Sequence, residues 1–167
     1  MDTDRTSFSK EGFWWWSAAS RRAFGALLIV VLMLGGCAKK EILGLHQDQP
    51  PHGGTPVALG ENYHIEFVLD APSGTLSAYI LDDEMEEFVR SNMPSFELTA
   101  KVGGVEQTLV FKPVANPATG ETVGDTSLFT AQADWLETAK TFDAVIKSVT
   151  LDGTTFTNVG FNFPKGN

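Results

Sequence analysis

The residue types that are scarce in this 167-residue chain already exclude several kinds of protein. It contains one cysteine, which excludes an intrachain disulfide and any multi-cysteine zinc or iron–sulfur site. Basic residues are also scarce: 12 Lys and Arg stand against 21 Asp and Glu, for a net charge of −9. We therefore expect no nucleic-acid partner, because nucleic-acid binding proteins usually present a basic surface.

Long hydrophobic runs are also missing. Arg21 and Arg22 precede twelve uncharged, mostly apolar residues, 23–34. A membrane-spanning helix needs roughly 20 such residues. A basic pair before a short apolar core is typical of a helical secretory signal peptide.

The apolar core ends with Leu34-Gly35-Gly36-Cys37. This sequence resembles the lipobox of bacterial lipoproteins, an aliphatic residue and two small residues before a cysteine. The resemblance implies a signal peptide over residues 1–36, cleavage before Cys37 and lipid attachment to its sulfur. Two or three acyl chains, each contributing about 0.8 kcal/mol per buried methylene, anchor a protein stably where a single chain does not. The alternative is an ordinary Cys37 after a signal-anchor helix.

The lipobox also implies a location and a partner. The mature protein would be attached to a membrane of the bacterial cell envelope through Cys37 and face the periplasm. Ala38, where an Asp would indicate inner-membrane retention, favours the outer membrane in a host that has one. Ser20-Arg21-Arg22-Ala23-Phe24 resembles a twin-arginine export signal, whereas the Leu/Ile/Val-rich core favours the general secretory route. Both routes remain open.

Residues 37–54 are predicted to form a lipidated flexible tether, stiffened locally by Pro50-Pro51. After them, apolar and polar residues alternate with the period of two that is typical of half-buried strands. Folding residues 63–70 onto 75–81 about the turn 71–74 pairs Leu69 with Leu76, Phe67 with Ala78 and Ile65 with Ile80. The apolar faces then match, which supports a hairpin.

Further strands are expected over residues 96–102, 105–114, 126–132, 144–151 and 154–163. Gly103-Gly104 and Asp152-Gly153 provide turns. Residues 134–140 are expected to form a helical turn capped by Asp134. We therefore predict an all-β domain over residues 55–165, an immunoglobulin-like antiparallel β-sandwich of about seven strands.

Motifs of catalysis are not found in the sequence. It has no Gly-x-Ser-x-Gly, no phosphate-binding glycine loop and no His-Glu-x-x-His. Lipid on Cys37 would also remove the only thiol. The sequence therefore predicts a protein that is not an enzyme.

The three histidines, His46, His52 and His64, lie within 19 residues of one another. Imidazole and carboxylate groups bind Cu²⁺ or Zn²⁺. In the hairpin register, the acidic run 82–87 begins opposite Tyr63 and close to His64. The sequence thus predicts a metal site of His52, His64 and Glu84.

His46 and Glu66 are further possible ligands, and Glu66 is expected to be solvent-facing beside His64, opposite Ile65 and Phe67. Alternatively, the histidines are solvated and the acidic run is a soluble loop or a short helix in which Asp83 and Glu86 form a capping box. The run could also attract Ca²⁺, although it lacks the spaced ligands of a calcium loop.

A second resemblance involves residues 52–82, and its matching residues are His52-Gly53-Gly54, Leu59-Gly60, Tyr63-His64-x-Glu66-x-Val68-x-Asp70, Gly74-x-Leu76 and Tyr79-x-Leu81-Asp82. They resemble a domain of small exported bacterial lipoproteins that occur near the periplasmic parts of metal-efflux systems. Members often carry another His after the Leu-Asp, where this chain has Asp83, Glu84 and Met85.

These features predict a membrane-anchored exported lipoprotein that serves as a binding or interaction module. A divalent transition metal, Cu or Zn, is the candidate ligand. The alternative is a structural or scaffolding envelope lipoprotein without a ligand, which docks an envelope protein partner.

Overall fold

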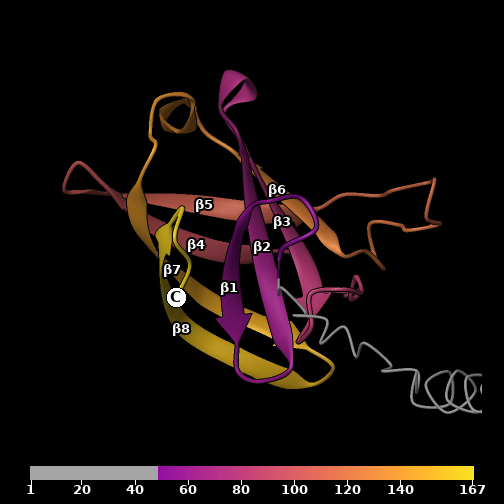
Figure 1. The fold of residues 1–167 in the computed structure, drawn as a ribbon. Helices are drawn as coiled ribbons and strands as arrows, with labels where there is room; N and C mark the ends of the chain where they lie inside the picture. Colours follow the sequence, from indigo (N-terminus) through magenta and orange to yellow (C-terminus); the bar gives the residue numbers. More distant parts are fainter. Residues whose placement is uncertain (1–48) are drawn as a thin grey trace, which may run out of the picture. The chain divides into compact units, whose positions relative to one another are not determined.

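The computed structural model describes residues 49–167, which fold into eight β-strands and two short 3₁₀ helices (Figure 1). The strands are β1 (Thr55–Leu59), β2 (Tyr63–Asp70), β3 (Thr75–Asp82), β4 (Phe96–Val102), β5 (Val105–Pro113), β6 (Leu128–Gln132), β7 (Phe142–Leu151) and β8 (Thr154–Phe163); the 3₁₀ helices are η1 (Ala71–Ser73) and η2 (Asp134–Glu137). The predicted signal peptide, Cys37 and His46 lie outside these residues. Within the described range, no helix has the length and apolar character needed to cross a membrane.

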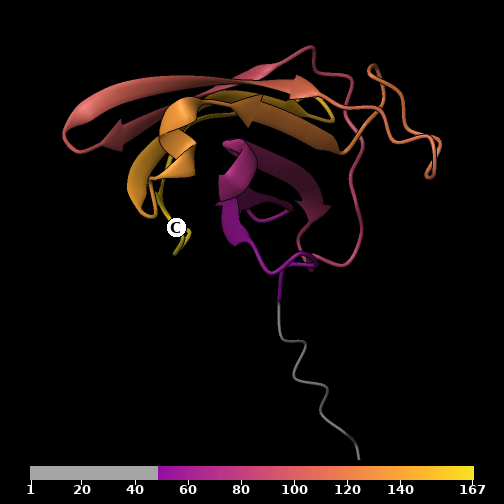
Figure 2. The same cartoon turned by 90° about the horizontal axis from the view of Figure 1, so that it is seen from above.

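The strands form one curved sheet in the order β1-β2-β3-β6-β5-β4-β7-β8, and all neighbours are antiparallel. β5 joins its two halves: it pairs with β4 along its length but with β6 only through Lys112 opposite Thr130 and Pro113 opposite Phe129. The sheet bends so that its halves face each other (Figure 2). The predicted all-β antiparallel sandwich is confirmed, with eight strands where about seven were expected.

The predicted β2–β3 hairpin is confirmed in register, with Leu69 opposite Leu76, Phe67 opposite Ala78 and Ile65 opposite Ile80. The eighth strand, β1, was not predicted. It has five residues and includes Pro56, which an edge strand tolerates because one side of it needs no partner.

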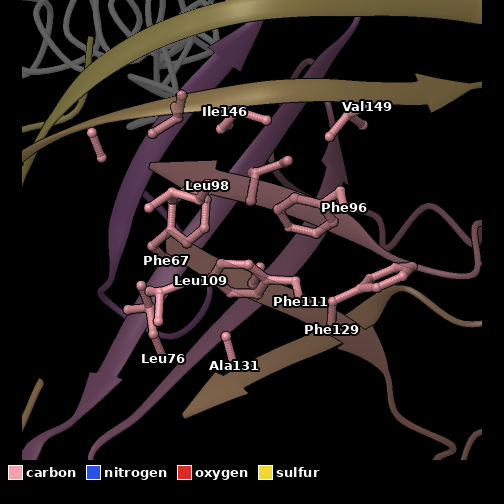
Figure 3. Close-up of a cluster of buried hydrophobic side chains, with 14 of the residues drawn as sticks. Phe67, Leu76, Phe96, Leu98, Leu109, Phe111, Phe129, Ala131, Ile146 and Val149 are labelled. Carbon is pink, nitrogen blue, oxygen red and sulfur yellow. The ribbon is translucent and has the colours of Figure 1, made fainter. Parts of the chain in front are cut away.

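Phenylalanine rings from both halves fill the core (Figure 3). Phe67 stacks on Phe161 with ring centroids 4.9 Å apart, and Phe96 stacks on Phe111 at 4.6 Å. Burying a side chain of this size contributes roughly 1.5–3 kcal/mol. The packed core leaves the outer face of β2 and β3, together with the long connections, to form the site described below.

The predicted cap of residues 134–140 is wrong, whereas the loop alternative for the acidic run is confirmed. The helical turn η2 begins after Ala133 and has no side-chain cap, so Asp134 does not cap it. Residues after Asp82 form a loop instead of a helix, and Oδ1 of Asp82 accepts the backbone N–H groups of Glu86 (2.9 Å) and Glu87 (3.2 Å). The acidic run is therefore a loop held by Asp82, and no helix begins at Asp83.

Candidate functional site

A buried carboxylate organises one side of the site. Glu66 lies on β2 on the face opposite the core and has no exposed surface. Its Oε1 accepts the backbone N–H groups of His52 (2.9 Å) and Gly54 (2.8 Å), and its Oε2 lies 2.8 Å from Nδ1 of His52. An ionised carboxylate can only accept, so Nδ1 carries the proton. The prediction that Glu66 faces solvent was wrong, because residues 52–54 cover it and supply three donors.

Residues 50–54 reach Glu66 through a tight turn. The N–H of Gly53 donates to the carbonyl of Pro50 (3.0 Å), and Gly53 has a φ of +66°. A Cβ on Gly54 would lie 2.5 Å from the carbonyl oxygen of Phe67, so only glycine allows this approach to β2. The last residues of the predicted tether are thus attached to the folded domain.

Three rings form an aromatic wall, which we define as His52, Tyr79 and Phe88. Tyr79 on β3 stands directly opposite Glu66 on β2, and the ring of His52 stacks on that of Tyr79 with centroids 3.9 Å apart and planes 17° from parallel. Phe88 is tilted against both, 5.7 Å from His52 and 6.1 Å from Tyr79. Burial, followed by the nearby Glu66 charge, raises the pKa of Tyr79 above its ordinary value.

Arg90 stands on the polar side of the site, after the β3 loop. Its Nη2 donates to the carbonyl of Thr119 (2.6 Å) and its Nη1 to Oδ2 of Asp125 (3.2 Å). Nε lies 3.9 Å from Oε1 of Glu121. These partners belong to the β5–β6 connection, so Arg90 ties two long loops together and its guanidinium is held in one orientation.

Glu121 is the second buried carboxylate, with 7% of its surface exposed. Oε1 accepts the backbone N–H (2.9 Å) and hydroxyl (2.7 Å) of Ser127, and Oε2 accepts the hydroxyl of Thr119 (2.9 Å). Burial acts to raise the pKa of Glu121. The hydrogen bonds from Ser127 and Thr119 and the Arg90 charge outweigh burial and hold the pKa below its ordinary value of 4.5.

Between these groups lies a cavity of about 290 Å³. It is lined by His52, Tyr79, Phe88, Arg90, Asn116, Thr119, Glu121, Ser127 and Leu128. Phe88 is 47% exposed at its edge. An aromatic wall facing a few positioned polar groups is the usual construction of a small-molecule site, because the first supplies contact area and the second fix orientation.

The predicted metal ligands are not brought together. His52 is bound to Glu66, whereas Nδ1 of His64 lies 3.3 Å from the backbone carbonyl of Asp82, and Glu84 is exposed on the loop that Asp82 holds. Across residues 49–167, no three His, Cys, Asp or Glu side chains gather as a metal site. Of the predicted set, His52 lies over the Glu66–Tyr79 pair, His64 stands between Ala58 and Leu81, and Glu84 belongs to the loop after β3.

Most of the pocket was missed from the sequence, namely Tyr79, Phe88, Arg90, Asn116 and Glu121. One signal was available, since Arg90 is the only arginine after Arg22 and ends a strongly acidic stretch. An isolated arginine among carboxylates is a candidate for an ion-pair network. Glu121 carried no comparable signal, because its hydrogen bonds depend on how two loops meet.

Comparisons of this chain with protein-family models, with curated proteins and with solved structures gave no match.

Proposed function

We propose that this protein is an exported, lipid-anchored protein of a bacterial envelope whose β-sandwich binds a small ligand in the pocket beside Arg90. The observation that carries the proposal is the pair of buried carboxylates, Glu66 and Glu121. Each is enclosed by protein donors, and each holds one wall of the cavity in place. Burying a carboxylate is costly unless it is fully hydrogen-bonded, so two of them around one cavity indicate a constructed site.

Binding is proposed in preference to catalysis because neither the serine nor the threonine hydroxyl of the cavity lining is hydrogen-bonded to the imidazole of His52. The hydroxyls of Ser127 and Thr119 both donate to Glu121, while Nδ1 of His52 is bound to Glu66. An activated nucleophile requires a hydroxyl or thiol bound to a base that is free to take its proton. Glu121 is instead enclosed by Ser127 and Thr119, an arrangement that supports the loop.

The pocket is tested by titrating the mature lipidated protein in detergent micelles and following backbone amide resonances by NMR. Four probe classes are used: a neutral monosaccharide, tetramethylammonium, benzoate and a dipeptide. We expect saturable changes at Tyr79, Phe88, Arg90 and Glu121 with one class. If no class gives a saturable change at these residues, the proposed binding function is refuted.

Membrane attachment is tested by Cys37→Ser. The variant should accumulate as an uncleaved precursor that incorporates no labelled palmitate, because the sulfur that accepts the lipid is gone. Ala38→Ser is the matched control and should be processed normally. Normal cleavage and labelling of Cys37→Ser would contradict the anchor.

A second candidate function, docking of an envelope protein, is favoured by the edge of β5. Because β5 pairs with β6 only at Lys112 and Pro113, the preceding part of β5 has one unpaired side, and Val105 and Val110 are 59% and 44% exposed. An extended partner segment could pair there. A photo-crosslinker at Val110, but not at the exposed Val123, should then join one defined protein; equal labelling from both positions would count against docking.

A further inference from the structure

We infer that the ligand of this pocket is a neutral saccharide, with one ring face on the aromatic wall and its hydroxyl groups toward Arg90 and Asn116. The inference rests on the proposed function and specifies the ligand class. It follows from the aromatic wall, the polar wall, the charge balance and the size of the cavity, taken in turn.

The aromatic wall offers an apolar face in a polar setting. Phe88 packs against His52 and Tyr79, yet 47% of its surface remains exposed. A sugar ring presents one side of C–H groups, slightly positive, which match the negative π-face of an aromatic ring. Few other small polar molecules combine such a face with a rim of hydroxyl groups.

The opposite wall carries planar polar groups in fixed orientations. Two N–H groups of Arg90 donate to Asp125 and Thr119, which leaves further N–H groups of the five on a guanidinium for a ligand. Oδ1 of Asn116 accepts the N–H of Ala118 at 3.2 Å, which orients the amide on the cavity wall. Hydroxyl groups both donate and accept, so they suit a wall that mixes donors and acceptors.

The charges disfavour ionic ligands of either sign. The single positive charge of Arg90 is more than offset by the two carboxylates of Glu121 and Asp125, which leaves no uncompensated cation for an anionic ligand. The oxygens of Glu66 and Glu121 accept hydrogen bonds from the protein, so an incoming cation would find them already engaged. A neutral ligand avoids both difficulties.

The cavity volume of about 290 Å³ lies just below the range of roughly 300–1,000 Å³ that is usual for ligand pockets. Phe88 in the lining is partly exposed, so a sugar ring at the end of a longer chain can reach it. Free monosaccharides and the glycan strands of the cell wall share this chemistry, and the experiment separates them.

The experiment titrates the mature lipidated protein with methyl glucoside and with N-acetylglucosamine, again by NMR. Saturable binding is expected, and Phe88→Ala should weaken it by about tenfold because the stacking surface is lost. Arg90→Lys, which removes the planar fork, should weaken it by about fivefold or more. Val123→Ala, an exposed apolar residue outside the cavity lining, is the control and should bind as the wild type does.

Sedimentation with insoluble cell-wall glycan forms the second arm. The inference is supported if either experiment shows sugar binding that Phe88→Ala weakens. Binding in the titration identifies free monosaccharides as the ligand, and binding in the sedimentation identifies cell-wall glycan. The inference is overturned if Phe88→Ala binds the sugar as tightly as the wild type and unfolds at the same temperature. If Phe88→Ala unfolds at a lower temperature, Arg90→Lys replaces it, and unchanged sugar binding by Arg90→Lys then overturns the inference. If only tetramethylammonium, benzoate or a dipeptide binds, the saccharide is refuted while the pocket stands, and if nothing binds both fail.

Discussion

Nδ1 of His52 lies 2.8 Å from the fully buried carboxylate of Glu66, and the same imidazole stacks on Tyr79, the cross-strand neighbour of Glu66. One side chain therefore covers a strand pair that would otherwise face solvent. The chain enters the domain at His52, and His52 is therefore part of the cavity wall.

Removing the carboxylate should cost stability. We expect Glu66→Ala to lower the free energy of unfolding by about 2–4 kcal/mol, because the N–H groups of His52 and Gly54 lose their acceptor. Urea unfolding measures the change. Glu97→Ala, at an exposed position on β4, is the control and should stay within about 0.5 kcal/mol. Equal losses in both variants would show that Glu66 has no special role.

Adding a single methyl group at Gly54 should also destabilise the domain. The Cβ of Gly54→Ala would lie 2.5 Å from the carbonyl oxygen of Phe67, so residues 52–54 would have to leave β2. A loss of about 2 kcal/mol or more is expected in the free energy of unfolding, because the hydrogen bonds to Glu66 are lost too. Gly124→Ala meets no atom within 4 Å and serves as the control. An unchanged melting temperature for Gly54→Ala would refute this packing.

Both tyrosines of the protein should ionise at higher pH than free tyrosine. The hydrogen bond from the Tyr63 hydroxyl to Asp152 (2.9 Å) raises the pKa of Tyr63 above 10.0, and burial with the Glu66 charge raises that of Tyr79. Ultraviolet titration of the folded protein should therefore show phenolate forming above pH 10.0. Asp152→Asn should bring only Tyr63 back toward that value. A single transition at the denatured-state pH would contradict both environments.

The sequence was most informative where alternation and turn residues determine structure locally. The β2–β3 register followed from matching Ile65, Phe67 and Leu69 with the facing strand, because a slip of one residue would expose that face. The same alternation wrongly predicted that Glu66 faces solvent. An alternation of apolar and polar residues distinguishes the core face of a strand from its outer face, but it cannot show that another segment covers the outer face. The contact of His52 with Glu66 needs a turn that only the folded chain displays.

The pocket was less predictable for a related reason. Arg90, Thr119 and Glu121 come from two connections whose meeting depends on the backbone pairing of Ser91 with Thr126. Long irregular connections carry no periodic pattern, so neither their path nor their partners can be read from residue spacing.

Acid should weaken the Glu121 network. The folded-state pKa of Glu121 is depressed, so its contribution to stability is present above its ordinary pKa of 4.5 and is lost as the pH falls through the lower folded value. Glu121→Gln should thus be less stable than the wild type at about pH 7, and the gap should narrow by about pH 3. Urea unfolding at both pH values measures it, with the exposed Glu106→Gln controlling for the loss of one charge. A gap that is the same at both values would exclude this linkage.

The position of His52 in the chain also limits how far it can lie from the proposed lipid on Cys37. His52 comes fifteen positions after Cys37, and a fully extended chain of fifteen residue steps spans about 50 Å. With the proposed lipid on Cys37, His52 can lie no farther than about this distance from the lipid. Tension along this segment would act on the Pro50–Gly53 turn and then on the hydrogen bonds that join His52 and Gly54 to Glu66, so this wall of the cavity stands where the domain is attached.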